Sequence, residues 1–136
     1  MGKLIPFTLT DLGKITNHRS GEIKFGEKMI TVPQGVSAIE FLATCESKYV
    51  LLGIPEDIGI RANYGRPGAA SAWKNAIKSI ANIQHNRFCK GNQIVVLGQL
   101  NVIEEMKEVA HLDFNDIDDR SKLSQLVEKI DKEVSH

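Results

Sequence analysis

Two largely apolar runs stand out along the chain, one over residues 48–54 and one over residues 93–100. Apolar runs of this length, bounded by polar residues, are typical of strands covered on both faces of a parallel sheet. Between them, over residues 69–83, apolar side chains recur every three or four positions, which predicts an amphipathic helix. Strand, helix and strand in this order form a β-α-β unit, whose strands are parallel and whose crossover is right-handed.

The first 47 residues carry weaker patterns. A helical turn is predicted over residues 11–15, and a β-hairpin over residues 23–32, where apolar and polar residues partly alternate around Gly26. Residues 33–43 have near-helical apolar spacing, and Pro33 suits a helix start. We therefore expect an irregular N-terminal extension that ends in a short helix.

The last third of the chain is predicted to be helical. Residues 101–115 lack a clear period, so we expect a partly helical connection. Residues 116–136 have the pattern of a helix with Asp118, Asp119 or Ser121 at its start, where a cap and negative charge are favourable. Its apolar face comprises Leu123, Leu126, Val127, Ile130 and Val134.

These elements predict an α/β protein with an extension over residues 1–47 and an α/β unit over residues 48–136. Strand, helix, strand and helix in succession call for a third parallel strand. Without one, the outer edge of the second strand would be unpaired, and apolar strand edges promote association. We expect the chain either to dimerise or to cover that edge with its extension.

Composition narrows the function. With 136 residues, 42% of them hydrophobic and 25% charged, the chain resembles a soluble globular domain. Its 17 basic and 17 acidic residues cancel, so no net field favours nucleic acid or an anionic membrane. No signal peptide or membrane-spanning segment is predicted. Cys45 and Cys89 lack Cys-x-x-Cys spacing, which favours reduced thiols. We expect a cytoplasmic protein with a small-molecule partner.

The segment after the first strand has the richest chemistry. Over residues 49–70 it carries four glycines, two prolines and four charged side chains before the helix starts. Ordered loops of this length in a compact domain are usually binding or active-site elements. The candidate substrate-binding residues are Asp57, Arg61, Asn63 and Arg66.

The order of residues in this segment, Gly-x-Pro-x-Asp-x-Gly-x-Arg-x-Asn-x-Gly-Arg-x-Gly-Ala from Gly53, resembles the first strand, loop and helix of the ureohydrolases: arginase, agmatinase and formimidoylglutamase. The formimidoylglutamase branch is nearest, on the residues Asp57, Arg61, Asn63, Gly65, Arg66, Gly68 and Ala69. The resemblance implies a three-layer α/β fold with a parallel sheet, two manganese ions, a homo-oligomer, and hydrolysis of an amidino or guanidino C–N bond.

The metal-binding segments of that family are absent from this sequence. They are a Gly-Gly-x-His, an Asp-x-His-x-Asp and a later Asp-x-Asp segment, and the His-x-Asp at His111 has Val109 where a carboxylate is needed. The resemblance therefore implies a truncated, partial arginase-like fold: the amino-terminal portion of such an enzyme, with no catalytic residue and no metal ligand of its own, and inactive alone.

Arg61 and Arg66 carry planar forks suited to carboxylates, and Asn63 can both donate and accept. If the intact enzyme acts on N-formimidoyl-glutamate, as the resemblance implies, the glutamate carboxylates are their targets and Asp57 orients an arginine. The alternative is that Asp57 pairs with Arg61 or Arg66 only to hold the loop together.

Two other functions remain open. The first is a free-standing small-ligand-binding or interaction domain that has an arginase-like half-fold without the chemistry. The second is a nucleotide-binding module, since a glycine loop before a helix can cradle phosphate. The glycines of this loop do not follow Gly-x-Gly-x-x-Gly, and no Gly-Lys-Ser/Thr follows them, which disfavours the second function.

Overall fold

The computed structural model describes residues 3–135. The chain divides into two compact units, each discontinuous in sequence. The sheet unit comprises Ile5–Gly53 and Lys74–Gln99. The helical unit comprises the residues up to Leu4, Ile54–Trp73, and the residues from Leu100 onwards. The domain boundary predicted between residues 47 and 48 stays a prediction, and the extension contributes strands to the sheet.

The sheet has four strands and is mixed, and β4 (Ile94–Leu100) is its central strand. On one side β4 pairs in parallel with β3 (Tyr49–Gly53). The other side pairs with two short strands of the extension, β1 (Leu4–Pro6) and β2 (Ile30–Thr31), of which β2 is parallel. The extension thus covers the outer edge of β4, which confirms one of the two predicted solutions.

The β1–β4 pairing is antiparallel. The Phe7 amide donates to the Leu97 carbonyl at 3.0 Å, and the Asn101 amide donates to the Lys3 carbonyl at 2.7 Å, so the two strands run in opposite directions. The predicted parallel β-α-β unit is confirmed for β3 and β4, but the complete sheet is not all-parallel.

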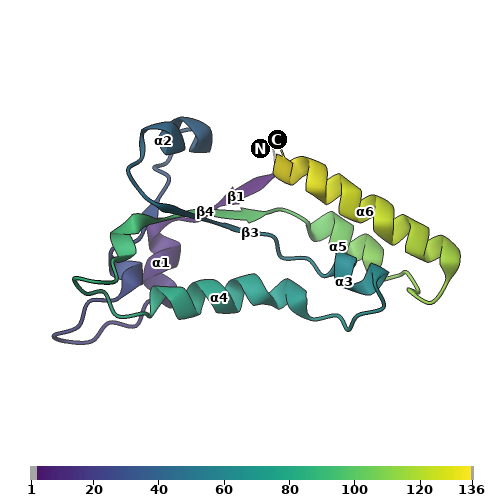
Figure 1. Cartoon of the computed structure of the whole chain (residues 1–136), viewed down its shortest axis with the longest axis horizontal. Helices are drawn as coiled ribbons and strands as arrows, with labels where there is room; N and C mark the ends of the chain where they lie inside the picture. The colour runs from purple at the N-terminus through teal and green to yellow at the C-terminus, as the bar shows by residue number, and fades with distance from the viewer. Residues whose placement is uncertain (1–2, 136) are drawn as a thin grey trace. The chain divides into compact units, whose positions relative to one another are not determined.

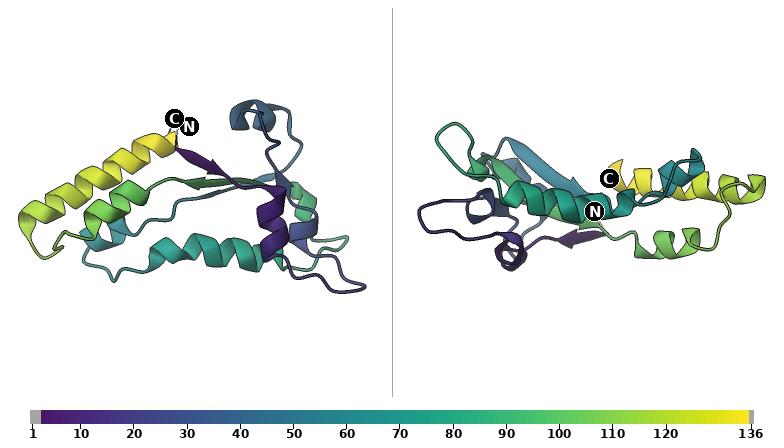
Figure 2. Two further views of the ribbon diagram at one scale, coloured as in Figure 1. Left: turned by 180° about the vertical axis from the view of Figure 1, so that it is seen from behind. Right: turned by 90° about the horizontal axis from the view of Figure 1, so that it is seen from below.

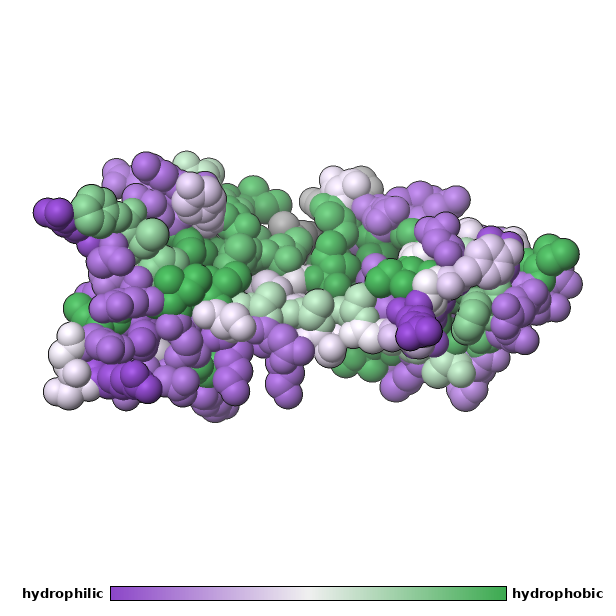
Figure 3. Space-filling model, turned by 60° about the horizontal axis from the view of Figure 1, so that its bottom comes forward, coloured by the Kyte–Doolittle hydropathy of each residue, from purple (hydrophilic) through white to green (hydrophobic). Residues whose placement is uncertain are grey.

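The two predicted strands differ in burial. Val95, Val96 and Leu97 of β4 are buried. On β3, however, Tyr49 is 59% exposed and Val50 is 47% exposed, so the expectation that this strand is covered on both faces is wrong at its start. Within residues 3–135, β3 pairs only with β4, and its outer edge is open. Figure 3 shows apolar surface open to solvent on the sheet unit.

Helices of the sheet unit follow the predicted order. They are α1 (Leu9–Ile15), α2 (Ala38–Thr44) and α4 (Ala72–Ala81), with a 3-10 turn at Ala69–Ser71 leading into α4. Helix α4 runs along one face of the sheet (Figures 1 and 2) and buries Ile77 and Ala81. The helical turn, the short helix and the amphipathic helix expected from the sequence are confirmed.

The predicted hairpin over residues 23–32 is wrong. Phe25–Glu27 is a 3-10 turn, closed by the Lys28 amide donating to the Phe25 carbonyl at 2.8 Å. Phe25 and Met29 are both buried, and residues four apart share a face in a strand as well as in a helical turn, so this spacing could not distinguish the two. The chain then pairs with β4 through β2 instead of folding back on itself.

The helical unit contains α3 (Ile58–Ala62), α5 (Ile103–Val109) and α6 (Ile117–Ser135). The three helices share one core with the last residue of β4 and the residues after it, formed by Ile58, Leu100, Val102, Val109, Leu123, Leu126 and Ile130. The partly helical connection and the long terminal helix are confirmed. The prediction that Asp118, Asp119 or Ser121 caps this helix is not confirmed. The cap is the Asp116 carboxylate, which accepts from the amides of Asp118 and Asp119, at 2.9 and 3.0 Å.

None of the helices within residues 3–135 combines the length and the apolar character that crossing a membrane requires.

Candidate functional site

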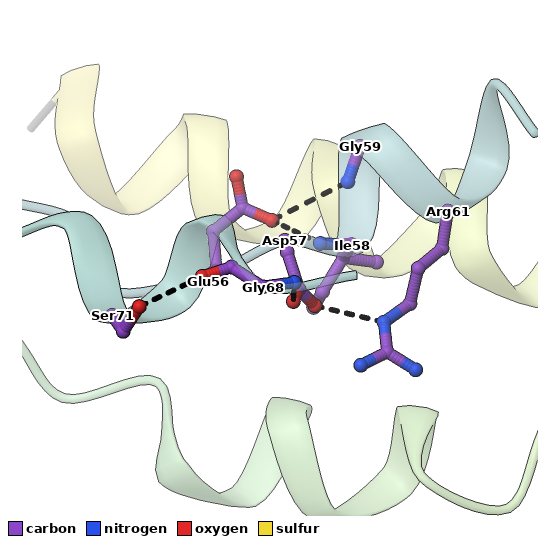
Figure 4. Close-up of polar contacts among 7 residues, drawn as sticks. All are labelled: Glu56, Asp57, Ile58, Gly59, Arg61, Gly68 and Ser71. Carbon is purple, nitrogen blue, oxygen red and sulfur yellow. Dashed lines mark hydrogen bonds and ion pairs between the residues drawn. The ribbon is translucent and has the colours of Figure 1, made fainter. Parts of the chain in front are cut away.

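The segment after β3 is not the continuous loop expected over residues 55–67, because it contains α3. Glu56 lies just before this helix, and its Oε2 accepts from the amides of Ile58 and Gly59 (Figure 4), the second at 3.3 Å. These amides have no partner inside a helix, so a carboxylate beside them stabilises the helix start. Sequence reasoning missed this role, although an acidic residue just after a proline is a usable signal for a helix start.

Asp57 is the centre of the segment. Its side chain is only 3% exposed. One carboxylate oxygen accepts from Arg61 Nε at 2.8 Å, and the other accepts from the Gly68 amide at 2.7 Å (Figure 4). The hydrogen bond from Gly68 joins two residues that are eleven positions apart in the sequence, on either side of α3. Asp57 thereby joins the start of the segment to its end.

These contacts also set the charge of Asp57. Burial would raise the pKa of this carboxyl, but the hydrogen bonds from Arg61 and the Gly68 amide outweigh burial and hold the pKa below its ordinary value. Asp57 is therefore ionised at neutral pH. A carboxylate of lowered pKa is a weak base, so its role here is to orient Arg61 rather than to accept a proton.

Arg61 uses Nε for Asp57 and leaves its two terminal nitrogens without a hydrogen bond to any of residues 3–135. Figure 4 shows these nitrogens pointing away from the carboxylate. The side chain is 23% exposed, so it is partly shielded yet reachable from solvent. Two parallel N–H donors on a fixed guanidinium are the geometry that best receives a second carboxylate.

The other two predicted residues have different environments. Asn63 follows α3, and its Nδ2 donates to the Gly59 carbonyl at 3.1 Å, which satisfies a carbonyl in the last turn. Arg66 is exposed, and none of its contacts with the described residues is a hydrogen bond or an ion pair. The structure thus brings Asp57 and Arg61 together, uses Asn63 for the helix end, and leaves Arg66 free of them.

The end of α3 explains the glycine at position 65. The Tyr64 amide donates to the Arg61 carbonyl at 3.1 Å, and the Gly65 amide donates to the Ile60 carbonyl at 2.7 Å, the two hydrogen bonds of a Schellman motif. A Cβ on Gly65 would lie 2.4 Å from Ile60 Cγ2 and 2.9 Å from the Ile60 carbonyl oxygen. Any side chain at position 65 would therefore disrupt the turn.

Tyr64 occupies the left-handed position of this motif, with φ 60°. Glycine is usual there, and a residue with a side chain loses roughly 1–2 kcal/mol in this conformation. Gly68 also has positive φ, 136°, and its amide is the one that binds Asp57. The residue pattern of the motif leaves position 64 unspecified. The feature of the sequence that could have drawn attention to Tyr64 is its place directly before a glycine at the end of a short helix.

The described residues do not fit a manganese centre. Within residues 3–135 no three His, Cys, Asp or Glu side chains lie close enough together to hold a metal ion. Both oxygens of Asp57 are already used by Arg61 and Gly68. Cys45 is partly buried and Cys89 is exposed, and both are free thiols. The group of this segment suited to an anion is the Arg61 guanidinium, whose Nε is held by Asp57.

Comparison with known proteins yielded no family model, no curated protein and no solved structure that matches this chain. The resemblance to the ureohydrolases therefore depends on the residue pattern of the sequence from Gly53 to Ala69.

Proposed function

We propose that this chain is the amino-terminal part of a manganese-dependent ureohydrolase that hydrolyses an amidino or guanidino C–N bond. The nearest member is formimidoylglutamase, which converts N-formimidoyl-glutamate to glutamate and formamide. The chain alone is inactive, because the three metal-binding segments of that family do not occur in it.

The observation that carries the proposal is the Asp57–Arg61 pair after β3. The segment leaves β3 at its carboxyl end, and ligands of open parallel sheets gather beyond the carboxyl ends of the strands. The buried Asp57 holds the Arg61 guanidinium through Nε and leaves a fork of donors for an incoming carboxylate. N-formimidoyl-glutamate carries two carboxylates, one of which this fork would receive.

The constrained positions of the motif support the same proposal. Asp57 holds Arg61 and Gly68, Asn63 satisfies the end of α3, and Gly65 occupies a place where no side chain fits. A loop that serves only as a connection does not need this degree of order. Fixing the arginine before substrate arrives reduces the entropy lost on binding.

The test begins with the reading frame of the gene. We expect it to continue past His136 and to encode Gly-Gly-x-His, Asp-x-His-x-Asp and Asp-x-Asp segments. The protein from the complete frame, purified and supplied with Mn²⁺, should release formamide from N-formimidoyl-glutamate. The 136-residue chain under the same conditions should release none. Formamide release by the short chain would contradict the proposal.

Arg61 gives the sharper variant. In the complete protein, Arg61→Gln removes the carboxylate fork, so KM for N-formimidoyl-glutamate should rise by roughly tenfold to a hundredfold, the effect of losing a charge-assisted hydrogen bond. Lys132→Gln is the matched control, because it removes one positive charge from an exposed position of α6 in the same unit. Equal effects of the two substitutions would argue against a substrate role for Arg61.

The same experiments address the alternatives. A stop codon directly after the codon for His136 would favour a free-standing domain that binds a small anionic ligand. Thermal stabilisation of the chain by nucleotides would favour a nucleotide-binding module, and we expect no such stabilisation.

A further inference from the structure

Tyr64 is, within residues 3–135, the one residue other than glycine that has positive φ. Glycine would suit this backbone position at the end of α3 better. Tyr64 is also 60% exposed, so burial of the aromatic ring does not explain why a tyrosine stands there. Strained residues persist where the surrounding structure holds them, often at functional segments. The contacts of the Tyr64 ring therefore indicate what the side chain does.

Those contacts come from Arg120, in the first turns of α6. The guanidinium carbon of Arg120 lies 4.0 Å from the centroid of the Tyr64 ring, a cation–π arrangement. Nη1 of Arg120 donates to the Tyr64 hydroxyl, and Nη2 donates to the Ala62 carbonyl at 3.3 Å. Arg120 thus contacts the turn on both sides of Asn63, through a side chain and through the main chain.

Within the described residues, Nε of Arg120 is buried without a hydrogen bond, which is unfavourable. The contacts with Tyr64 and Ala62 are the ones that hold the guanidinium in place. Helix α6 is in turn fixed to α3 by the common core, through Leu123 and Ile58 among others. The turn after α3 is therefore attached to a long, packed helix.

We propose that Arg120 is a positioning residue for the candidate site. By stacking on Tyr64 and binding the Ala62 carbonyl, it holds the turn that follows α3 in one conformation, so that Arg61 faces an anionic substrate without reordering. The inference rests on the proposed function for the nature of the substrate. It adds that α6, more than fifty residues further along the chain, determines how Arg61 is presented.

The first arm of the test uses the 136-residue chain and needs no activity. The Gly65 amide closes the turn, and its hydrogen exchange should accelerate about tenfold in Arg120→Ala and in Tyr64→Asn. Asparagine is chosen at position 64 because it tolerates the left-handed conformation but lacks the aromatic ring. Tyr64→Phe retains the stacking and should rescue most of the protection. The double variant should exchange no faster than Arg120→Ala, because Arg120→Ala already removes both the stacking on Tyr64 and the hydrogen bond to the Ala62 carbonyl.

The second arm uses the protein from the complete reading frame. Arg120→Lys keeps the charge but loses the planar fork, and we expect KM for N-formimidoyl-glutamate to rise about fivefold to tenfold with kcat within about twofold. Lys132→Ala on the same helix is the control and should change neither constant. A role in folding alone would lower the yield or the melting temperature without changing KM.

The outcomes are distinguishable. Unchanged exchange of the Gly65 amide in Arg120→Ala would overturn the inference, as would faster exchange with an unchanged KM. If the complete wild-type protein releases no formamide, the proposed function fails, and with it the identity of the substrate. The exchange arm then still decides whether Arg120 holds the turn.

Discussion

At the scale of single residues, the segment after β3 depends on Asp57. Both oxygens of this buried carboxylate are used, one by Arg61 and one by the Gly68 amide. The sequence made Asp57 and Arg61 candidates because both fall in the ureohydrolase pattern, and it left open whether Asp57 serves the loop or a ligand. In the structure both oxygens of Asp57 hold the segment together, which leaves the proposed contact with a substrate to Arg61.

Asp57→Asn should lower the free energy of unfolding of the 136-residue chain by roughly 1–3 kcal/mol, because the charge-assisted pair with Arg61 is lost and the asparagine NH2 would face one of two donors, Arg61 Nε or the Gly68 amide. Urea unfolding monitored by circular dichroism measures the change. Asp131→Asn, at an exposed position of α6, is the control and should have little effect. Equal stability of the two variants would show that the pair contributes nothing measurable.

At the scale of elements, helix α6 shows why periodicity is informative for long helices. The predicted apolar face places Leu123, Leu126 and Ile130 in the core of the helical unit. The same face loses its cover toward the end of the helix, where Val134 is 40% exposed. Apolar spacing thus predicts which face is buried, and only the packing decides how far along the helix the core extends.

Leu123→Ala should therefore destabilise the chain by roughly 2–4 kcal/mol, as expected for a fully buried leucine that leaves a cavity. Leu123 is 1% exposed. Val134→Ala removes an apolar side chain from the same predicted face and should change stability by less than about 1 kcal/mol. Thermal melts of both variants test the difference, and similar effects would show that the face is buried along its whole length.

Strand β3 has an open edge and carries the exposed residues Tyr49 and Val50. Open strand edges of this kind pair with other strands. We expect the isolated chain to associate as its concentration rises, and Val50→Lys to abolish this association, since a lysine on an edge strand discourages pairing. Leu9→Lys, at an exposed position of α1, is the control. Sedimentation velocity across a concentration series measures it, and a monomeric wild type throughout would refute the prediction.

At the scale of the whole molecule, ion pairs join segments that are far apart in the sequence. Within the helical unit, Glu105 of α5 is 2% exposed and binds two lysines, Lys3 at 2.6 Å and Lys129 of α6 at 3.0 Å. Burial would raise the pKa of Glu105, but the hydrogen bonds from the two lysines outweigh it and lower the pKa to about 2. No pattern in the sequence distinguishes Glu105 from its exposed neighbour Glu104.

The pKa of Glu105 predicts how stability depends on pH. Because the pKa is lower in the folded chain than its ordinary value of 4.5, the stabilisation is complete above about pH 4.5 and is lost as the pH falls toward 2. Glu105→Gln should be less stable than the wild type at neutral pH, and the difference should shrink in acid. Urea midpoints at pH 7 and pH 3 measure this. Glu104→Gln, whose side chain is 80% exposed, should show no such convergence.

The sequence by itself determined the elements whose burial follows from a local period: the β-α-β unit, the amphipathic helix after the motif, and the long terminal helix. It also determined the motif, because a strand followed by Asp57, Arg61, Asn63 and Gly65 in order is visible without coordinates. Tertiary structure alone decided that Phe25 belongs to a turn and not to a hairpin, and that the extension pairs with β4. It also decided that Arg120 contacts Tyr64. These features depend on contacts between residues distant in the chain, and a local pattern of polar and apolar positions carries no record of such contacts.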